Sequence, residues 1–321
     1  MKKLITMAII ASSIIINTMP AEANLKTRTS VPTLAILDTA LDTSIPSIKS
    51  KLVAEVCILD WPSCPNGKSF MEGAGSSVLP MNILSTANFN HGTQMASVAI
   101  ANNPNLNIVF VRIFGHTSKG QRQTTGINTL VNALNWVKAN KDKYNIVAVS
   151  ASQGATAPVI NKSATSPYCS ATALDSVIAS LDSVGLPVFF PSGNSGMNAK
   201  MSGKIEWPAC ISQSIAVGGV ESGSHLDKPQ ISLTSSYDEK LVDLWGEIGQ
   251  NVYLPGNVSG YAYGTSVSAQ VIAAKYVYLK TLKPSLTTSQ LISLMKTASS
   301  PVENTFNQKV YLFNLSKAIN G

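Results

Sequence analysis

The chain has 321 residues, of which 45% are hydrophobic and 13% are charged, and its formal net charge is +7. This composition excludes a disordered or fibrous chain and suits one well-packed globular unit. The basic residues gather in no stripe or cluster, so we expect a solvated surface and no binding of nucleic acid.

The N-terminus has the three-part pattern of a secretory signal peptide. Lys2 and Lys3 precede an apolar run over residues 4–16, and small residues follow at Ala21 and Ala23. The run is too short, and too rich in Ser and Thr, to span a bilayer comfortably, so we expect cleavage after Ala23 and no stable membrane anchor. The pattern predicts a secreted or periplasmic protein.

The rest of the chain shows no internal repeat, low-complexity tract or long linker. We therefore predict three parts, namely a signal peptide over 1–23, a short N-terminal segment over 24–32 and a single domain over 33–321.

Short apolar runs rich in β-branched residues recur along this domain and are typical of strands buried on both faces. The predicted strands are 33–37, 107–113, 145–149, 186–190 and 214–217. Between them, apolar residues repeat at helical spacing over 127–137 and 174–184, and Thr287 and Gln290 form the capping box of a last helix. The alternation predicts an α/β fold, with a doubly wound, mostly parallel sheet that carries helices on both faces.

Four cysteines in an exported chain are more typical of disulfides than of metal ligands. They allow three pairings, and four free thiols stay an alternative. Cys57 and Cys64 flank a Trp-Pro turn and can close a small loop, whereas Cys169 and Cys210 each border a predicted core element. We favour the pairs Cys57–Cys64 and Cys169–Cys210.

Gly264, Thr265 and Ser266 form a turn that leads into an apolar helix. At a helix N-terminus, free N–H groups and the helix dipole favour the negative charge that appears when a serine attacks a carbonyl. A serine at a glycine turn is, however, far more often an N-cap than a nucleophile. The pattern alone therefore does not identify a catalytic serine.

Two further residues strengthen the catalytic interpretation of Ser266. Asp38 follows a predicted strand, and His91 opens a predicted helix. An aspartate at a strand end is often a turn former, and a lone histidine is often a satisfied polar residue, as we expect for His116 and His225. The chain order Asp, His, Ser on three separate elements is nevertheless the order of subtilisins, and not that of chymotrypsin or the α/β-hydrolases.

The chain resembles the subtilases, the subtilisin-like serine proteases, over nearly all of its mature length. The matching segments are 35–39 around Asp38, 90–93 around His91, 264–266 before and including Ser266, and 111–115, 152–154, 192–194, 216–219 and 242–245 between them. The resemblance implies a serine endopeptidase that acts on protein or peptide substrates through an acyl-enzyme. In it, His91 accepts the proton of Ser266 and Asp38 orients the imidazole.

The resemblance also implies roles outside the triad. Asn194, otherwise read as a turn residue, corresponds to the oxyanion-hole asparagine, whose amide acts with the backbone N–H of Ser266. Trp207-Pro208 matches a cis peptide bond beside the primary specificity pocket. Two backbone edges that present themselves to an extended substrate correspond to Ser118, Lys119 and Gly120 and to Ser152, Gln153 and Gly154.

Glu206 stands where the specificity pocket usually has a small residue. A carboxylate at a pocket floor selects a cation, so we hypothesise a preference for Lys or Arg before the cleaved bond. The alternative is that Glu206 turns to solvent or pairs with a neighbouring lysine.

Several positions depart from the family pattern. Gln270 replaces a proline of the serine helix, Gln94 replaces a second histidine, and Ser97 replaces a glycine. These changes keep open a second hypothesis, a catalytically weak or inactive peptide-binding protein with the subtilase fold. A third hypothesis is an unrelated α/β binding protein with coincidental motifs.

Ser47 replaces an acidic residue that many relatives use to bind calcium, so the sequence shows no readable calcium site. We expect no metal and no cofactor, with bound calcium as the alternative. Segment 24–32 is too short for an inhibitory pro-domain. The chain is therefore expected either to fold unaided or to use a separate chaperone or inhibitor chain, and to be a monomer.

Overall fold

The structure is a computed structural model. It describes residues 31–154, 169, 173–197, 204–222, 228–238, 240–303 and 309–320. The expected signal peptide, most of segment 24–32 and His225 lie outside the described residues.

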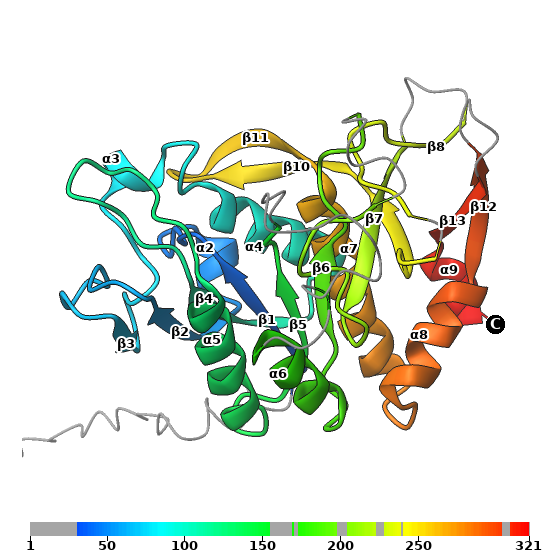
Figure 1. The fold of residues 1–321 in the computed structure, drawn as a ribbon, viewed down its shortest axis with the longest axis horizontal. Coiled ribbons are helices and arrows are strands. Elements are labelled where there is room, and N and C mark those ends of the chain that lie inside the picture. The colour runs from blue at the N-terminus through cyan, green and yellow to red at the C-terminus, as the bar shows by residue number, and fades with distance from the viewer. Residues whose placement is uncertain are drawn as a thin grey trace, which may run out of the picture.

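A large central sheet organises the described part of the chain (Figure 1). Its strands are β1 (Thr33–Asp38), β2 (Leu52–Ile58), β3 (Phe70–Glu72), β4 (Asn107–Arg112), β5 (Ile146–Ala151), β6 (Val188–Pro191), β7 (Ile215–Glu221), β8 (Gln230–Ile231), β9 (Leu244–Glu247), β12 (Ser299–Glu303) and β13 (Lys309–Phe313). The order is β12-β13-β9-β7-β6-β5-β1-β4-β2-β3, with β8 paired to β7. The pairings from β13 through β2 are parallel, while those of β3, β8 and β12 are antiparallel. The predicted mostly parallel sheet is confirmed.

Helices cover both faces of this sheet (Figure 1). They are α2 (Pro46–Lys49), α3 (Met81–Leu84), α4 (His91–Asn102), α5 (Ile127–Ala139), α6 (Ala173–Asp182), α7 (Thr265–Leu282), α8 (Thr288–Thr297) and α9 (Leu315–Asn320). One core cluster packs the sheet against α5 and α6, and a second packs it against α4 and α7. The doubly wound arrangement is therefore confirmed as well.

The strand β1 shows why the apolar runs of this sequence form strands. All six of its residues are buried. Ala35 and Leu37 belong to the core cluster with α5 and α6, whereas Leu34 and Ile36 belong to the cluster with α4 and α7. Successive side chains of a strand point to opposite faces, so a strand between two helix layers needs apolar residues on both faces along its interior.

Two local features of the backbone agree with the sequence analysis. The side chain of Thr287 accepts a hydrogen bond from the N–H of Gln290, and Thr287 N donates to Gln290 Oε1 at 2.8 Å, which completes the predicted capping box of α8. The peptide bond between Trp207 and Pro208 is cis, as predicted.

The strand β1 also lies where the winding of the sheet changes direction. It pairs with β4 on one side and with β5 on the other. In doubly wound sheets, ligands bind at the carboxyl ends of the strands beside such a switch point. Asp38 is the last residue of β1 and therefore lies at that edge.

A two-stranded ribbon lies beside the sheet and leads into α7. It consists of β10 (Gly249–Leu254) and β11 (Val258–Tyr263), which pair antiparallel. The buried carboxylate of Asp42 accepts hydrogen bonds from Ser44 N at 2.9 Å and Gly256 N at 2.7 Å, so it ties the ribbon's turn to the loop after β1. The ribbon thus holds the start of α7 close to the end of β1.

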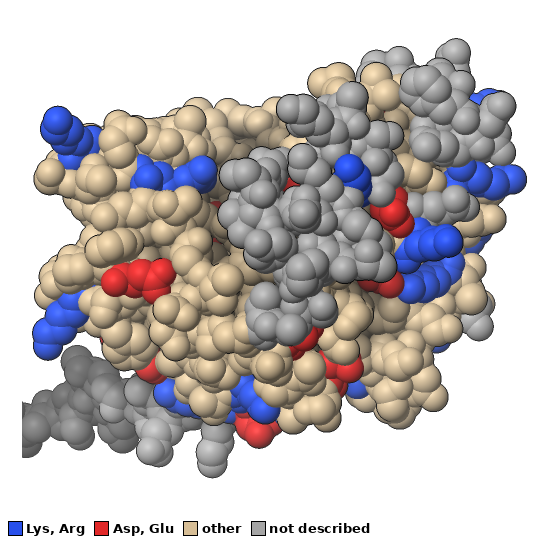
Figure 2. Space-filling model, viewed as in Figure 1, with Lys and Arg blue, Asp and Glu red and all other residues tan. Residues whose placement is uncertain are grey.

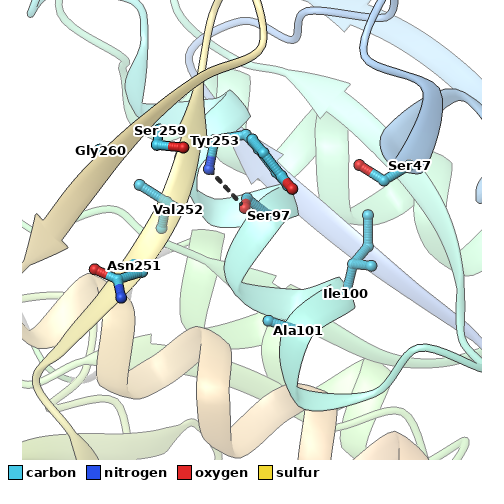
Figure 3. Close-up of a pocket in the computed structure, with 9 residues that line it drawn as sticks. All are labelled: Ser47, Ser97, Ile100, Ala101, Asn251, Val252, Tyr253, Ser259 and Gly260. Carbon is cyan, nitrogen blue, oxygen red and sulfur yellow. Dashed lines mark hydrogen bonds between the residues drawn. The ribbon is translucent and has the colours of Figure 1, made fainter.

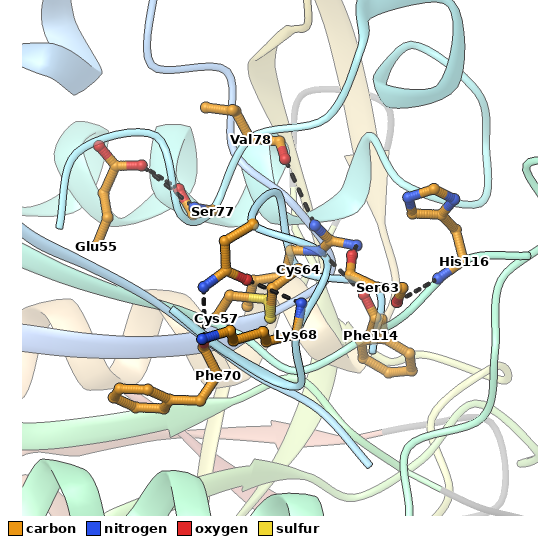
Figure 4. Close-up of a disulfide and its surroundings, with 12 residues drawn as sticks. Glu55, Cys57, Ser63, Cys64, Lys68, Phe70, Ser77, Val78, Phe114 and His116 are labelled. Atoms are coloured by element: carbon orange, nitrogen blue, oxygen red, sulfur yellow. Dashed lines mark hydrogen bonds between the residues drawn. A yellow bond between two sulfur atoms is a disulfide. The ribbon is translucent and has the colours of Figure 1, made fainter. Parts of the chain in front are cut away.

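Both disulfides that the sequence favours are present, Cys57–Cys64 and Cys169–Cys210. Figure 4 shows the first and its surroundings. Beside it, Arg112 is fully buried, and its guanidinium donates to the carbonyl oxygens of Phe114 at 3.0 Å, Ser63 at 3.3 Å and Val78 at 3.5 Å. Burial lowers the pKa of Arg112 to about 10, so the side chain stays charged at neutral pH and joins three loops.

On the face that Figure 2 shows, Lys and Arg side chains lie mostly near the margins, with Asp and Glu among them. Among the described residues, no helix has the length and apolar character needed to cross a bilayer.

The loops around Arg112 give a test of stability. Arg112→Met keeps much of the side-chain volume but leaves one buried and two partly buried carbonyl groups without their donor, so we expect a loss of about 3 kcal/mol in the free energy of unfolding. Urea denaturation measures this loss. The matched control is Arg122→Met, whose exposed side chain should cost at most about 1 kcal/mol. Equal stability of the two variants would contradict the role given to Arg112.

Candidate active site

A cavity of about 490 Å³ opens at the carboxyl edge of the sheet. The residues predicted from the sequence that line it are Asp38, His91, Ser152, Gln153, Gly154, Asn194, Glu206 and Ser266. Other lining residues include Thr39, Phe114, Arg122, Thr124, Thr125, Gly193, Trp207 and Thr265. Residues far apart in the chain are thus brought to one site.

The carboxylate of Asp38 holds the ring of His91. His91 Nδ1 lies 2.9 Å from Asp38 Oδ1 and 3.0 Å from Oδ2. Asp38 is 1% exposed, and it also accepts the N–H of Thr39 at 2.6 Å. A carboxylate accepts hydrogen bonds, so Nδ1 carries the proton and Nε2 of a neutral ring is left as a base.

The start of α4 is fastened to the loop after β1. Thr39 Oγ1 donates to the carbonyl of Phe89 at 2.8 Å and accepts the N–H of Gly92 at 2.9 Å. A Cβ on Gly92 would lie 2.4 Å from the carbonyl oxygen of Ala40, so only glycine allows this approach. The packing explains why a glycine follows His91, and it fixes the backbone that carries the imidazole.

Ser266 is the second residue of α7 and is half-buried. Gly264 caps the helix with a φ of 134°, a conformation that favours glycine. The first N–H groups of a helix have no partner within the helix, so they and the helix dipole favour negative charge at this end. Negative charge is therefore favoured beside the hydroxyl of Ser266.

Asn194 is bound to the same helix end through its side-chain oxygen. Asn194 Oδ1 accepts the N–H of Thr265 at 2.9 Å and its hydroxyl at 3.0 Å, and Thr265 Oγ1 also accepts the N–H of Gly193 at 3.3 Å. These bonds occupy the acceptor of the amide, so its N–H groups are left as donors. Thr265 is fully buried and directly precedes Ser266, so these bonds link the start of α7 to the loop that carries Asn194.

A model of the subtilase family matches residues 30–312. The chain belongs to the subtilase family. It is 23% identical over 258 residues to the major intracellular serine protease of Bacillus subtilis (strain 168), a match that covers 77% of this chain and 67% of that protein. It is 25% identical over 226 residues to alkaline elastase YaB of Bacillus sp. (strain YaB), which covers 67% of this chain and 51% of that protein. The chain is thus a serine-type peptidase. Its match to the elastase spans about half the length of that protein.

Solved structures of low sequence identity show the same fold. The protease domain of PatA has a TM-score of 0.66 at 13% identity and covers 90% of this chain and 94% of its own. The prenylagaramide maturation protease PagA has a TM-score of 0.63 at 14% identity, and the match covers 94% of this chain and 98% of PagA. A cold-adapted subtilisin-like serine proteinase has a TM-score of 0.62 at 20% identity, and the match covers 88% of this chain and 87% of the proteinase.

Only part of the expected substrate edges lines the cavity of this subtilase. Ser152, Gln153 and Gly154 follow β5 and line it. The segment Ser118, Lys119 and Gly120 lies instead in a turn, closed by a bond from Gly120 N to Thr117 O at 2.9 Å, and is not among the lining residues. The same loop contributes Arg122, Thr124 and Thr125. The match of a short Gly-containing segment did not reveal which part of the loop turns inward.

Glu206 does not turn to solvent, because it is only 7% exposed. Its Oε1 accepts the N–H of Asn194 at 3.0 Å and the hydroxyl of Ser195 at 2.8 Å. These two bonds were not foreseen from the sequence, since they join residues that are close only after folding.

Two of the departures from the subtilase pattern have local partners. Gln94 Nε2 donates to Asn90 Oδ1 at 3.0 Å, within the first turn of α4. Ser97 Oγ accepts the N–H of Tyr253 at 2.9 Å, so it ties α4 to β10. Gln270 is fully buried in α7, and neither of its amide atoms has a hydrogen-bond partner in the described structure.

A second cavity, of about 480 Å³, lies between α4 and the β10–β11 ribbon (Figure 3). Ser47 is one of its lining residues, with Ser97, Asn251, Tyr253 and Ser259 among the others, and none of the nine carries a charge. Among the described residues, no three His, Cys, Asp or Glu side chains gather as metal ligands do. The expectation that no metal binds stays a prediction.

Burial and the neighbouring charges together set the pKa of His91. Burial lowers this pKa, the charge and hydrogen bond of Asp38 raise it, and the charge of Arg122 lowers it; the net effect is a pKa above the ordinary value of 6.5. Arg122 lies over the ring of Phe114, 5.1 Å from its centroid, at the cavity wall.

NMR titration of the imidazole resonances tests this balance, since the chain has only three histidines. We expect the pKa of His91 to fall in Asp38→Asn, which removes the raising causes, and to rise in Arg122→Gln, which removes a lowering one. The effect of Arg122 should weaken in high salt. Lys317→Gln, the same loss of charge on the exposed side of α9, should leave the pKa unchanged, and an equal shift in both variants would contradict the assignment.

Proposed function

We propose that this chain is a secreted serine endopeptidase whose catalytic triad consists of Asp38, His91 and Ser266. The observation that carries the proposal is the pair of Asp38 and His91 Nδ1, 2.9 Å apart, in the same cavity as Ser266. Membership of the subtilase family supports it, because that order of residues is the family's.

The roles follow from the chemistry of each group. Neutral His91 accepts the proton of Ser266 Oγ as the oxygen attacks a peptide carbonyl, and it then delivers this proton to the leaving amine. Asp38 keeps the ring in the required tautomer and stabilises the imidazolium. Water then hydrolyses the acyl-enzyme, as His91 accepts a proton from the attacking water and returns it to Ser266 Oγ.

The oxyanion of the tetrahedral intermediate is held by two donors in this proposal, the side-chain amide of Asn194 and the backbone N–H of Ser266. The bonds from Thr265 to Asn194 Oδ1 support the first, because they leave the NH₂ group to donate. Loss of such a side-chain donor costs about 10²–10³-fold in kcat, a figure measured in a subtilisin.

A fluorophosphonate probe tests the triad. We expect it to label the wild-type chain and not Ser266→Ala, and we expect Ser266→Ala to lower kcat by about 10⁶-fold, as in a subtilisin. Ser268→Ala, two residues further along α7, is the matched control and should still be labelled. The mass of the labelled chain also tests export, because cleavage after Ala23 leaves Asn24 at the N-terminus.

The second candidate is a weak or inactive peptide-binding subtilase. The unpaired, buried amide of Gln270 favours it, since this residue lies one helical turn beyond Ser266 on α7. A wild-type chain that folds but takes up no probe would support this candidate and sink the triad proposal.

Substrate would bind in extended form along residues 152–154 in this proposal, by the backbone pairing that adds a strand. Glu206 supports a preference for Lys or Arg before the cleaved bond, because its carboxylate lines the cavity and a Cβ on Gly154 would lie 2.9 Å from Oε2. An oxygen so close to the predicted substrate edge is suited to a cationic side chain.

Matched peptides that differ only in the residue before the cleaved bond test this preference. We expect kcat/KM to be highest for Arg, lower for Leu and lowest for Glu, with the advantage of Arg over Leu lost in Glu206→Gln. Equal rates on Arg and Leu in the wild-type chain would discard the preference but not the triad.

Export, folding and assembly complete the proposal. Two disulfides fit an oxidising compartment and so support a secreted or periplasmic location. We further propose a monomer without metal or cofactor, which folds unaided or with a separate chaperone or inhibitor chain.

A further inference from the structure

The carboxylate of Glu206 is built into the loop that carries Asn194. Its Oε1 accepts the backbone N–H of Asn194 at 3.0 Å and the hydroxyl of Ser195 at 2.8 Å. The backbone N–H of Glu206 in turn donates to the carbonyl of Ser192 at 2.7 Å. The side chain and the main chain of Glu206 thus both bind the segment over residues 192–195.

Close packing keeps the carboxylate in this place. A Cβ on Gly193 would lie 2.3 Å from both Cγ and Cδ of Glu206, and the φ of Gly193 is 113°. A Cβ on Gly154 would lie 2.9 Å from the other oxygen, Oε2. Two positions without side chains therefore enclose the glutamate, which is only 7% exposed.

Asn194 is held from two sides as a result. Thr265 binds its side-chain oxygen, and Glu206 binds its backbone N–H. A hydrogen bond to a carboxylate is shorter and stronger than one to a neutral acceptor. The amide of Asn194 is itself exposed to the cavity, so these bonds, together with the neighbouring loop contacts, set the direction of its N–H groups.

We propose that Glu206 is a positioning residue of the oxyanion hole, which acts through the backbone of Asn194. This inference rests on the proposed role of Asn194. It assigns different tasks to the two oxygens of one carboxylate, since Oε1 holds the loop and Oε2 borders Gly154 at the cavity. A Lys or Arg side chain of the substrate, at the residue before the cleaved bond, would then contact the same carboxylate that orients Asn194.

The decisive substrate is a peptide with Leu before the cleaved bond, because a neutral residue makes no use of the charge of Glu206. Glu206→Met keeps the volume but removes the acceptor, and we expect it to lower kcat by about 10- to 100-fold with little change in KM. Glu206→Gln keeps an acceptor, and its kcat should stay within about 3-fold of wild type.

A residue that served only substrate choice would behave differently. Glu206→Met would then leave the rate on the Leu peptide unchanged or raise it, and this result overturns the inference. Thermal unfolding and probe stoichiometry of each variant separate loss of fold from loss of rate. If Glu206→Met does not fold, Glu206→Gln and Ser195→Ala carry the test. A 10-fold loss of kcat in Glu206→Gln that exceeds the loss in Ser195→Ala also overturns the inference, because Gln keeps the acceptor.

A double-mutant cycle locates the effect. In an Asn194→Ala background, which has already lost the side-chain donor, Glu206→Met should lower kcat by less than about 3-fold. Losses that multiply would show that Glu206 acts elsewhere. A wild-type chain that neither cleaves nor takes up probe overturns the proposed function and this inference with it, whereas a cleaving wild type matched by Glu206→Met overturns the inference alone.

Discussion

The site depends on a charge buried at the end of a strand. Removing a carboxylate from water is costly unless hydrogen bonds replace the lost hydration. Asp38 has such partners in His91 Nδ1 and the N–H of Thr39, and its side chain is almost fully enclosed. The loop after β1 and the start of α4 must therefore keep their relative positions, because a separation would remove the His91 donor and leave the carboxylate with the N–H of Thr39.

The rest of the site is built around the first turn of α7. Thr265 uses its backbone N–H and its hydroxyl to bind Asn194, while the next residue carries the hydroxyl of Ser266. Glu206 reaches the same loop from the opposite side. A helix end, a loop and a carboxylate thus form one hydrogen-bonded unit, which explains why residues separated by many positions in the chain have a fixed geometry.

Features that depend on local periodicity could be predicted from the sequence. The buried strands β1 and β4 are apolar at the four positions between their first and last residues, and the capping box of α8 involves residues only three positions apart. Local periodicity did not predict which residues of the loop after β4 face the cavity. Its inward residues are Arg122, Thr124 and Thr125, and the packing of Phe114 under Arg122 becomes visible only in three dimensions.

The family resemblance supplied what local patterns could not, but it also concealed one property. It assigned Glu206 to substrate choice because relatives have a small residue there. The bond from Asn194 N to Glu206 Oε1 depends on a contact across 12 positions of the chain, and no motif encodes it.

The departures from the family pattern lie on the supporting elements and leave Asp38, His91 and Ser266 unchanged. Ser97 is hydrogen-bonded to Tyr253 on β10, and Gln94 is hydrogen-bonded to Asn90, the residue that precedes α4. Gln270 has no such partner among the described residues, and a buried amide without partners destabilises the fold by the cost of its lost hydration. That cost falls on α7, which is packed against β5, β6 and β7 along its length. Because so many contacts hold this helix, the strain need not reach its first turn, where Thr265 and Asn194 fix the position of Ser266.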